Sequence, residues 1–433
     1  MTVKERYEAY LRACAGRPGL WEVNGETRER QRLTAQGGTY RQASVDHQTV
    51  LYARAGETSV GYAVTQCLED EPEKLLEEAA ENGRLTGQAG MEPCQEARVS
   101  GEEKQRLSNP VMIADLARQG MKRLPEAELT IEEQIRGQWV VNQKGLNRQS
   151  SRRHFAVQAQ WKGYPFITSA PAPEQIEWAG LQEAIEQMRK NLEQPSSMQS
   201  SGVYPAVLSG YVMAKFFITA WKLWDARSYV GGGGVLRERG GTQIASSLVT
   251  LRDIPVWLGH GYEAVLDSEG SDGLVVDLVK QGVQTGLLHT LQTAAALGAQ
   301  TTGNAGRTAG LVKGYRTIVT PKNWVMEPGQ NTEEELLAQL GEGLYIFDAF
   351  DEFHAINPAS GDFNFPCNAV QIRRGKRQGL CRQLTISGNI LQVLASVEAL
   401  GNRLYEMPLI MQDTYQVAAP AALISAIHVT GSV

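Results

Sequence analysis

The sequence lacks most of the residue patterns that mark an enzyme active site. None of its six histidines belongs to an HExxH or HExxxH motif, the spacing that places two imidazoles of one helix on a zinc ion. No GxSxG turn occurs, so there is no serine nucleophile of the α/β-hydrolase type. The glycine run at 231–234 lacks the GK[ST] ending of a phosphate loop and is typical of a turn. From its residues alone, the chain has no evident catalytic centre.

Cysteines, long apolar runs and basic clusters are also scarce. The five cysteines are scattered without a CxxC pair, which favours reduced thiols over a disulfide framework or a thiolate zinc site. The most apolar stretch, 203–224, is interrupted by Lys215 and Lys222, so we expect no membrane span. The net charge is −6 without a Lys/Arg block, which gives nucleic-acid binding no electrostatic support. The first residues lack the apolar core of a signal peptide, and we expect a cytoplasmic protein.

The length and composition predict a soluble chain of more than one domain. At 433 residues it is too long for one ordinary core, while 42% hydrophobic and 21% charged residues are typical of globular proteins. The stretch PSSMQSSG at 195–202 has the composition of a linker. We therefore predict an N-terminal domain at 1–198, with sub-units of about 1–85 and 106–195, and a larger domain at 199–433.

Strand runs and segregated helices alternate along the chain in a way that predicts an α+β fold. Short strands at 50–53 and 60–64 precede a helix that ends near Gly83, and an amphipathic helix is predicted at 176–194. After the linker we predict a buried helix at 205–226, a strand-rich region, and helices at 332–341 and 389–400. The 332–341 helix has the clearest start signal, because Thr332 is a suitable N-cap and acidic residues follow it.

One stretch has side chains suited to chemistry of its own. If 348–354 is extended, Asp348, Glu352 and His354 share one face, because side chains alternate along a strand. Carboxylates and an imidazole at that spacing can bind a metal or exchange protons. The simpler alternative is a solvated strand end with ordinary acidic residues.

Segments of the second half resemble the TldD/PmbA family, formerly described as modulators of DNA gyrase. The resemblance implies an α+β fold with an N-terminal β/α domain and a larger strand-rich C-terminal domain of the TldD/PmbA type. The matching segments are GTQIASSLVTLRD (241–253), LDSEGSDG (266–273), QGVQTGLLHTLQTAAALGAQTTGNAGR (281–307), EPGQNTEEELLAQLGEGLYI (327–346), the stretch from NPASGDF to TISGNILQVL (357–394) and APAALISAIHVTG (419–431).

The family has two branches that work as a pair, and the resemblance is to the branch without metal ligands. The TldD branch looks like a metalloprotease with an HExxxH helix and a late cysteine ligand. Here the corresponding helix reads FITAWK at 217–222, and no cysteine follows Cys381. The resemblance implies a non-catalytic, TldE-like subunit without a cofactor, whose TldD-like partner holds zinc. Together they would act on unfolded or ribosomally synthesised peptides.

Two alternatives stay open at this point. One is a stand-alone hydrolase that uses a non-family site near Asp348, Glu352 and His354. The other is a homodimeric peptide-binding scaffold. The stretch FDAFDEFHAINPAS stands where the family often has a glycine-rich, histidine-containing loop, which indicates a specialised pair.

The resemblance also suggests where peptide or partner contacts lie, with no catalytic or metal-binding residue in this chain. By residue chemistry, Gly361 and Gly388 are typical turn glycines, and Asn389 is a typical helix N-cap. We also predict that four aromatic residues fill the space of the metal and its ligands in the TldD branch: Phe216, Phe217, Trp221 and Trp224. The suggested contact residues are Thr302, Gly303, Asn304, His354, Asp362 and Phe363.

Overall fold

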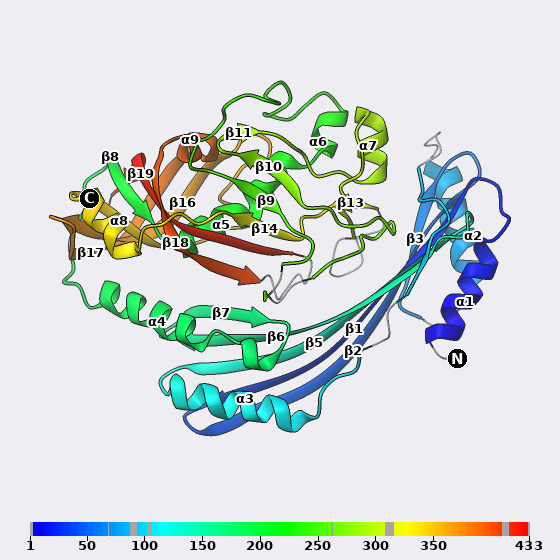
Figure 1. The fold of residues 1–433 in the computed structure, drawn as a ribbon, viewed down its shortest axis with the longest axis horizontal. Coiled ribbons are helices and arrows are strands. Elements are labelled where there is room, and N and C mark those ends of the chain that lie inside the picture. The colour runs from blue at the N-terminus through cyan, green and yellow to red at the C-terminus, as the bar shows by residue number, and fades with distance from the viewer. Residues whose placement is uncertain are drawn as a thin grey trace.

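Two β-sheets organise the chain, and long strands of the first curve beside the body formed by the second (Figure 1). The structure is a computed structural model. It describes residues 3–67, 69–86, 93–101, 105–257, 259–260, 263–307, 316–408 and 415–431. Within that part, none of the helices is both long and apolar enough to cross a membrane.

The first sheet has the order β3-β2-β1-β5-β6-β4, with β7 also paired to β6. All its pairings are antiparallel except β4 with β6. We call the long strands β1, β2, β5 and β6 the arm. The strands are β1 (Leu20–Gln36), β2 (Thr39–Gly56), β3 (Gly61–Thr65), β4 (Val99–Ser100), β5 (Glu128–Asn142), β6 (Asn147–Trp161) and β7 (Tyr164–Ala170).

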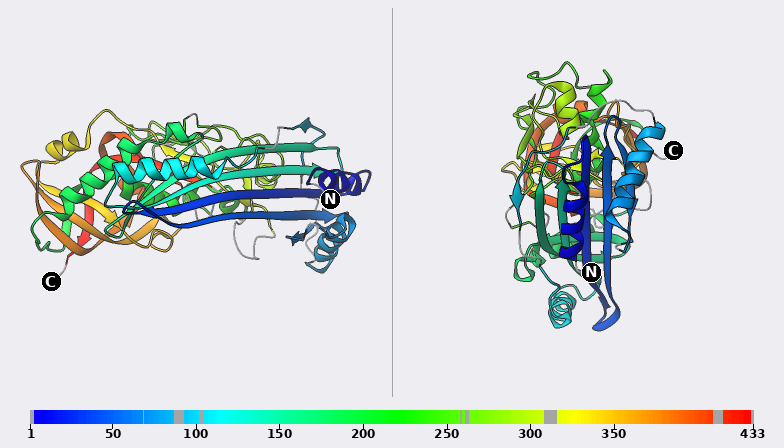
Figure 2. Two further views of the ribbon diagram at one scale, coloured as in Figure 1. Left: turned by 90° about the horizontal axis from the view of Figure 1, so that it is seen from below. Right: turned by 90° about the vertical axis from the view of Figure 1, so that its right-hand side faces the viewer.

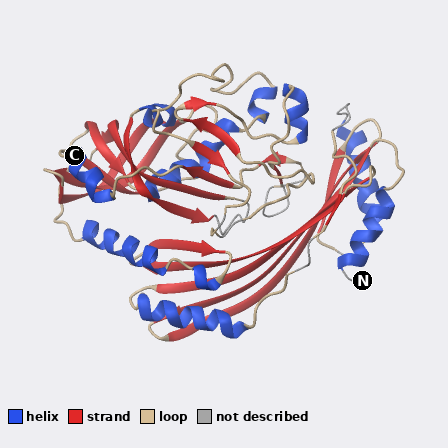
Figure 3. Ribbon diagram, viewed as in Figure 1, coloured by secondary structure: helices blue, strands red, loops and turns tan. Residues whose placement is uncertain are grey.

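Helices cover the outer face of the arm at both ends, as Figures 2 and 3 show. α1 (Val3–Cys14) and α2 (Pro72–Thr86) share a core with odd-numbered strand residues such as Val23 and Ala53. α3 (Pro110–Arg123) packs at the other end on odd-numbered residues such as Leu33. A short η1 (Pro173–Gln175) and then α4 (Trp178–Leu192) lead to the second sheet.

The second sheet has the order β11-β10-β9-β14-β19-β17-β16-β15-β8, with β18 paired to β19. Because β19 also pairs with β8, the strands β8, β15, β16, β17 and β19 close into a ring. The strands are β8 (Gly202–Leu208), β9 (Leu251–Asp253), β10 (Val276–Lys280), β11 (Val283–Gln284), β14 (Asn323–Met326), β15 (Gly343–Ala349), β16 (Asp362–Arg373), β17 (Lys376–Asn389), β18 (Val397–Pro408) and β19 (Gln416–Thr430).

The remaining elements of this body are short, apart from one buried helix beside the ring. A separate pair joins β12 (Ala305–Gly306) to β13 (Ile318–Val319). The α+β class predicted from the sequence is confirmed. The helices are α5 (Gly210–Ala220), η2 (Trp221–Trp224), α6 (Arg227–Val230), α7 (Leu291–Leu297), α8 (Glu333–Leu340) and α9 (Ile390–Ala395).

Several predicted boundaries were wrong. The predicted helix at 205–226 begins only at Gly210, because residues up to Leu208 form β8 between β15 and β19. The predicted helix at 389–400 ends at Ala395, and β18 follows. The predicted strands at 50–53 and 60–64 belong to β2 and β3, and β2 is far longer.

The predicted linker at 195–202 is hydrogen-bonded to the second sheet. The Ser197 amide donates to the Leu380 carbonyl at 2.8 Å, and the Leu380 amide donates to the Pro195 carbonyl at 2.8 Å. The first sheet's strands end at Ala170 and the second sheet begins at Gly202. The division into domains near residue 198 stays a prediction.

Candidate functional site

Helix α5 begins at a side-chain cap and runs through the core of the C-terminal body. The Ser209 hydroxyl accepts a hydrogen bond from the Val212 amide at 3.2 Å, which satisfies one of the free amides of the first turn. The helix is apolar almost all round, from Val212 to Ala220, as expected of a helix that is buried on every side. At Trp221 it tightens into the 3₁₀ turn η2.

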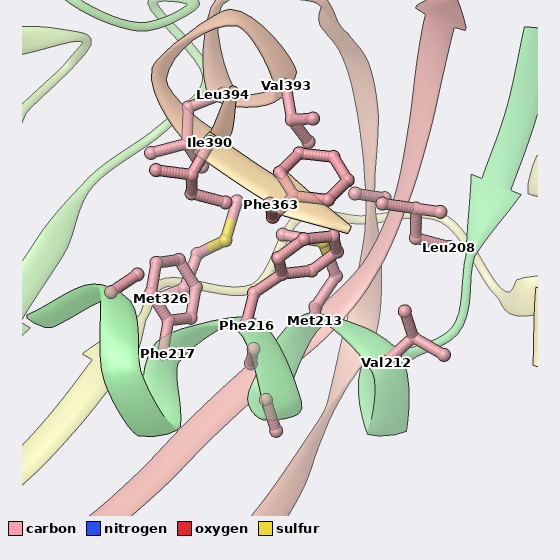
Figure 4. Close-up of a cluster of buried hydrophobic side chains, with 14 of the residues drawn as sticks. Leu208, Val212, Met213, Phe216, Phe217, Met326, Phe363, Ile390, Val393 and Leu394 are labelled. Atoms are coloured by element: carbon pink, nitrogen blue, oxygen red, sulfur yellow. The ribbon is translucent and has the colours of Figure 1, made fainter. Parts of the chain in front are cut away.

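The four aromatic residues of this segment are all buried. Phe216, Phe217 and Trp224 have no exposed surface, and Trp221 is 6% exposed. Figure 4 shows Phe216 and Phe217 pointing from α5 into the surrounding side chains. The prediction that this helix is core is therefore confirmed by its burial. The ring-centre distances are 4.8 Å for Phe216–Phe363, 4.9 Å for Phe216–Phe365, 5.9 Å for Phe217–Trp324, 5.9 Å for Trp221–Tyr415 and 5.3 Å for Trp224–Trp324.

The residues of this segment do not fit a zinc site. Zinc takes imidazole, thiolate or carboxylate ligands, whereas the two positions where the resemblance expects imidazoles hold the buried ring of Phe217 and the exposed side chain of Lys222. Across the described ranges, no three His, Cys, Asp or Glu side chains are grouped so that they could hold a metal ion.

The segment 357–363 forms a hydrogen-bonded corner against the start of α9. The Asn389 side chain caps α9 by accepting from the Leu391 amide at 3.0 Å, and its amide group donates to Asp362 Oδ1 at 2.8 Å. The Ser360 hydroxyl donates to Asp362 Oδ2 at 2.7 Å. These two hydrogen bonds hold the pKa of Asp362 below its usual value. Asp362 therefore acts first on the protein itself, as a turn and cap residue.

Phe363 and His354 lie in different surroundings from Asp362. Phe363 is buried against Phe216, so its ring belongs to the core. The His354 side chain is 81% exposed, and its Nδ1 lies 2.6 Å from Asp351 Oδ1. Peptide or partner binding at Asp362, Phe363 and His354 stays a prediction, and the structure does not bring the three side chains together around one ligand position.

The proposed shared face of Asp348, Glu352 and His354 was wrong. Strand β15 ends at Ala349, and Asp351 has a φ of 63°, so the segment turns instead of continuing as a strand. Burial raises the pKa of Asp348. The His354 side chain contacts Asp351 and does not share a face with Asp348 and Glu352.

The ammonium group of Lys215 occupies the space between the two carboxylates. Its Nζ lies 4.0 Å from Asp348 Oδ1 and 3.6 Å from Glu352 Oε2, and it also donates to the Ala349 carbonyl. The Tyr211 ring covers the ammonium at 4.4 Å. A buried cation with several such partners is a structural ion pair, which leaves no carboxylate pair ready for acid–base work.

A hydrogen-bonded cluster supports the neighbouring loops and contains Thr302, Gly303 and Asn304. The Asn304 amide group donates to Asp253 Oδ2 at 2.6 Å and to the Thr320 carbonyl at 3.0 Å, and it accepts from the Thr302 hydroxyl at 2.7 Å. Gly303 has a φ of 70°, and a Cβ there would lie 2.1 Å from the Asp272 carbonyl oxygen. A glycine is required at this close approach. Contact with a peptide or partner at these residues stays a prediction.

The loop LDSEGSDG joins the C-terminal body to the arm through buried charges. Arg54 of β2 donates to Glu269 Oε1 at 2.7 Å and to Glu22 Oε1 of β1 at 2.9 Å. Glu269 Oε2 accepts from the Leu291 amide at the start of α7. The Arg307 guanidinium is fully buried in the same charge cluster. Two carboxylates and two guanidiniums balance each other in this cluster, which we call the buried quartet.

A second arginine holds the other end of the same loop. Arg148 of β6 donates to the Gly270 carbonyl at 2.8 Å and to Asp272 Oδ1 at 2.7 Å, while Arg98 pairs with the other oxygen of Asp272. Sequence reasoning missed these arginines. Their partners are more than 100 residues away, and no local pattern in a single sequence links them.

The buried quartet makes the free energy of unfolding depend on pH, and this free energy falls as the pH rises. Burial, opposed chiefly by Arg54, raises the pKa of Glu22 from 4.5 to about 7. The folded state therefore favours the protonated carboxyl, and this stabilisation is present below pH 4.5 and is lost as the pH rises through 7. The loss amounts to about 3 kcal/mol for a shift of this size. We expect Glu22→Gln to flatten the change in unfolding free energy between pH 5 and pH 8, measured by denaturant titration.

The control for this experiment is Glu81→Gln on the surface of α2. Glu81 pairs with Arg84, and both side chains are more than half exposed. This variant should keep the pH slope of the parent protein. An unchanged slope in Glu22→Gln would show that Glu22 has the same protonation state in the folded and unfolded chain.

Comparison with known proteins gives matches in the C-terminal body. A family model described as the PmbA/TldA metallopeptidase C-terminal domain matches residues 201–431. The chain is 30% identical over 179 residues to a metalloprotease of Methanothermobacter thermautotrophicus and 25% identical over 179 residues to the metalloprotease PmbA of Escherichia coli O157:H7. The alignments cover 41% and 40% of this chain and 38% and 36% of the relatives. The chain thus matches less than half of the length of these relatives.

Two solved structures are similar over nearly the whole chain. TldE of Thermococcus kodakarensis has a TM-score of 0.81 at 16% identity, with 98% of this chain and 100% of that chain covered. A proposed modulator of a DNA gyrase from Thermotoga maritima MSB8 has a TM-score of 0.78 at 21% identity, with 99% and 100% covered. At these identities the likeness shows the shared fold, with a long N-terminal sheet and a larger mixed sheet.

Proposed function

The chain belongs to the PmbA/TldD metallopeptidase family, and from that premise we propose that it is the metal-free, TldE-like subunit of a two-component peptidase. Its partner is a TldD-like chain that holds the zinc ion. The pair acts on unfolded or ribosomally synthesised peptides, and this chain shapes the peptide site without carrying out the chemistry.

The observation that carries this proposal is the aromatic filling of α5 and η2. Phe217 and Trp221 are buried rings within the stretch 217–222 that corresponds to the metal motif, and each packs on another ring. A helix that fills its own core in this way has no room for a metal, its ligands and a water molecule. The same helix keeps its structural role, since Phe216 and Trp224 also stabilise the body.

The arm supports a role in holding an extended peptide. Strand β2 pairs with β3 only from Leu51 to Ala55, so among the described residues 39–50 have a strand partner on one side only. This outer edge contains no proline, and its charged residues are Arg41 and Asp46. An extended peptide can add to such an edge through its backbone.

The two alternatives have less support. A stand-alone hydrolase at Asp348, Glu352 and His354 would need these side chains around one position, whereas Lys215 occupies the space between the carboxylates. A homodimeric scaffold would use the same fold and edge strand, and it differs from our proposal in needing no TldD-like chain.

We expect peptide hydrolysis only when this chain and a TldD-like chain are combined. The measurement compares this chain alone, the partner alone and both together on an unfolded peptide, with the zinc content of each purified chain. Stoichiometric zinc and hydrolysis in this chain alone would contradict the proposal. Full activity of the partner alone, without co-purification of the two chains, would favour the homodimeric scaffold.

A further inference from the structure

A pocket lies between the loop that follows α6 and the helix α9. Its volume is about 560 Å³, within the range of about 300–1,000 Å³ that small-ligand sites span. One wall is formed by residues of the loop 235–245, and the other by residues of the segment 389–395, which contains α9. Figure 1 shows α9 on the side of the C-terminal body that faces away from the arm. The pocket therefore lies apart from the contact between the arm and the body.

Hydrogen bonds hold the two walls of the pocket in place. The Ile244 amide donates to the Gly282 carbonyl at 2.8 Å, which fixes the loop on the turn between β10 and β11. The Ser246 amide donates to the Leu394 carbonyl of α9 at 2.9 Å, which ties the loop directly to the helix. The pocket is thus formed before a ligand binds, and binding does not have to order the loop.

The charged lining of the pocket consists of one cation. Arg239 is exposed, and its guanidinium has no hydrogen-bond or ion-pair partner among the described residues. None of the described residues that line the pocket is an aspartate or glutamate, and the neighbouring Glu238 does not line it. A guanidinium carries N–H donors in a fork that matches the two oxygens of a carboxylate. The pocket therefore presents a positive charge that its own lining does not pair.

The rest of the lining is apolar or carries side-chain amides. Val235, Ile244 and Leu391 provide apolar surface. The Gln243 amide group donates to a backbone carbonyl of its own loop at 2.6 Å, which leaves its oxygen as an acceptor. The Gln392 side chain is exposed and bonds no described residue. A primary amide offers both a donor and an acceptor, so it can pair with a peptide group.

We propose that this pocket binds the C-terminal end of a peptide whose last side chain is apolar. Arg239 pairs with the terminal carboxylate through two parallel hydrogen bonds. The apolar wall contacts the last side chain, and Gln392 bonds the preceding peptide group. This binding site goes beyond the peptidase role proposed above, and it needs no TldD-like partner.

A peptide end fits this lining better than a fatty acid does. A fatty acid has the same carboxylate and an apolar body, but it carries no group that can bond the amides of Gln243 and Gln392. An apolar chain that covers these amides removes their water, which costs free energy unless another hydrogen bond replaces it. A peptide group replaces that hydrogen bond. Octanoate therefore serves as the competing probe in the test.

The test measures binding to the full chain by fluorescence anisotropy of a short peptide with fluorescein at its N-terminus and leucine at its C-terminus. We expect the free acid to bind about tenfold more tightly than the same peptide with a C-terminal amide, the effect of one charge-assisted hydrogen bond. A peptide that ends in serine should bind about tenfold more weakly than the leucine peptide, because it buries less apolar surface. Arg239→Gln should bind the acid and the amide equally.

The matched control is Arg373→Gln, which changes the net charge by the same amount. Arg373 is exposed near the end of β16 and does not line the pocket. This variant should keep the preference for the free acid, and both variants should melt like the parent protein. An amidated peptide with an internal glutamate should bind as weakly as the plain amide.

Four outcomes would overturn the proposal. They are equal binding of acid and amide by the parent protein, an unchanged preference in Arg239→Gln, equal losses in both variants, and displacement of the peptide by octanoate as readily as by unlabelled leucine peptide. Tight binding of the amidated glutamate peptide would assign the pocket to acidic side chains and would contradict recognition of the C-terminus. All of these measurements use this chain alone, so their result does not depend on the proposed two-component peptidase.

Discussion

Replacing Arg54 with alanine should lower the free energy of unfolding by about 3–5 kcal/mol, as expected when one partner of a buried ion cluster is removed. The Arg54 side chain is 1% exposed and lies within 2.9 Å of both Glu22 and Glu269. Without it, two buried carboxylates remain with Arg307 alone. Denaturant titration measures the change. Arg84→Ala is the control, since its exposed pair with Glu81 contributes only about 0.2–1 kcal/mol.

The same variant should loosen the contact between the arm and the C-terminal body. Arg54 stands on β2, whereas Glu269 lies in the loop 267–273 and accepts from the amide of Leu291 at the start of α7, so the ion pair joins a strand of the arm to a loop of the C-terminal body. We therefore expect faster hydrogen exchange in the loop 267–273 of Arg54→Ala than of Arg84→Ala. Unchanged stability and exchange would mean that Arg307 and the carboxylates reorganise without cost.

Helices with local start signals could be predicted closely from the sequence. The Thr332 hydroxyl accepts from the Glu335 amide and the Glu335 carboxylate accepts from the Thr332 amide, which forms the capping box at the predicted start of α8. The helix α4 lies within the predicted 176–194 range. These signals lie within a few residues of one another, so packing against neighbouring strands does not change the helix start that they predict.

Strand lengths could not be predicted, because the middle of the arm is polar on both faces. The residues 39–48 of β2 show no alternation of buried and exposed side chains, and backbone pairing with β1 alone keeps them extended. The helix predicted for residues 205–208 was wrong for the opposite reason. They are apolar without a clear period, and only their pairing with β15 and β19 decides that they form a strand.

The contacts that organise the candidate site are long-range and were missed for that reason. Arg54 and Glu269 are 215 residues apart in the sequence. The resemblance drew attention to the loop LDSEGSDG, but nothing in the loop indicates that arginines of β2 and β6 bind it. The neighbours Arg28, Arg136 and Arg152 are equally hidden in the sequence, because only the register of three strands places them opposite one another.

Trp221→Ala should lower the free energy of unfolding by about 3–5 kcal/mol, as for other buried aromatic side chains cut to alanine. The indole is 6% exposed and packs against the Tyr415 ring at 5.9 Å, and the Tyr415 hydroxyl donates to the Ile218 carbonyl at 2.8 Å. Removing the indole leaves a cavity at the end of α5. Thermal melting measures the effect. Lys222→Ala, which changes the adjacent exposed residue, should shift stability by less than about 0.5 kcal/mol.

The same variant separates a structural role of this helix from a direct functional one. If Trp221 is core, Trp221→Ala should impair the partner's peptidase activity only in proportion to the fraction of unfolded chain. Activity per folded complex, measured below the melting transition, should then equal that of the parent. A Trp221→Ala chain that melts normally but fails to support hydrolysis would place this turn in contact with peptide or partner. In that case the aromatic residues would form a surface that binds peptide or partner, and they would not serve only to fill the core.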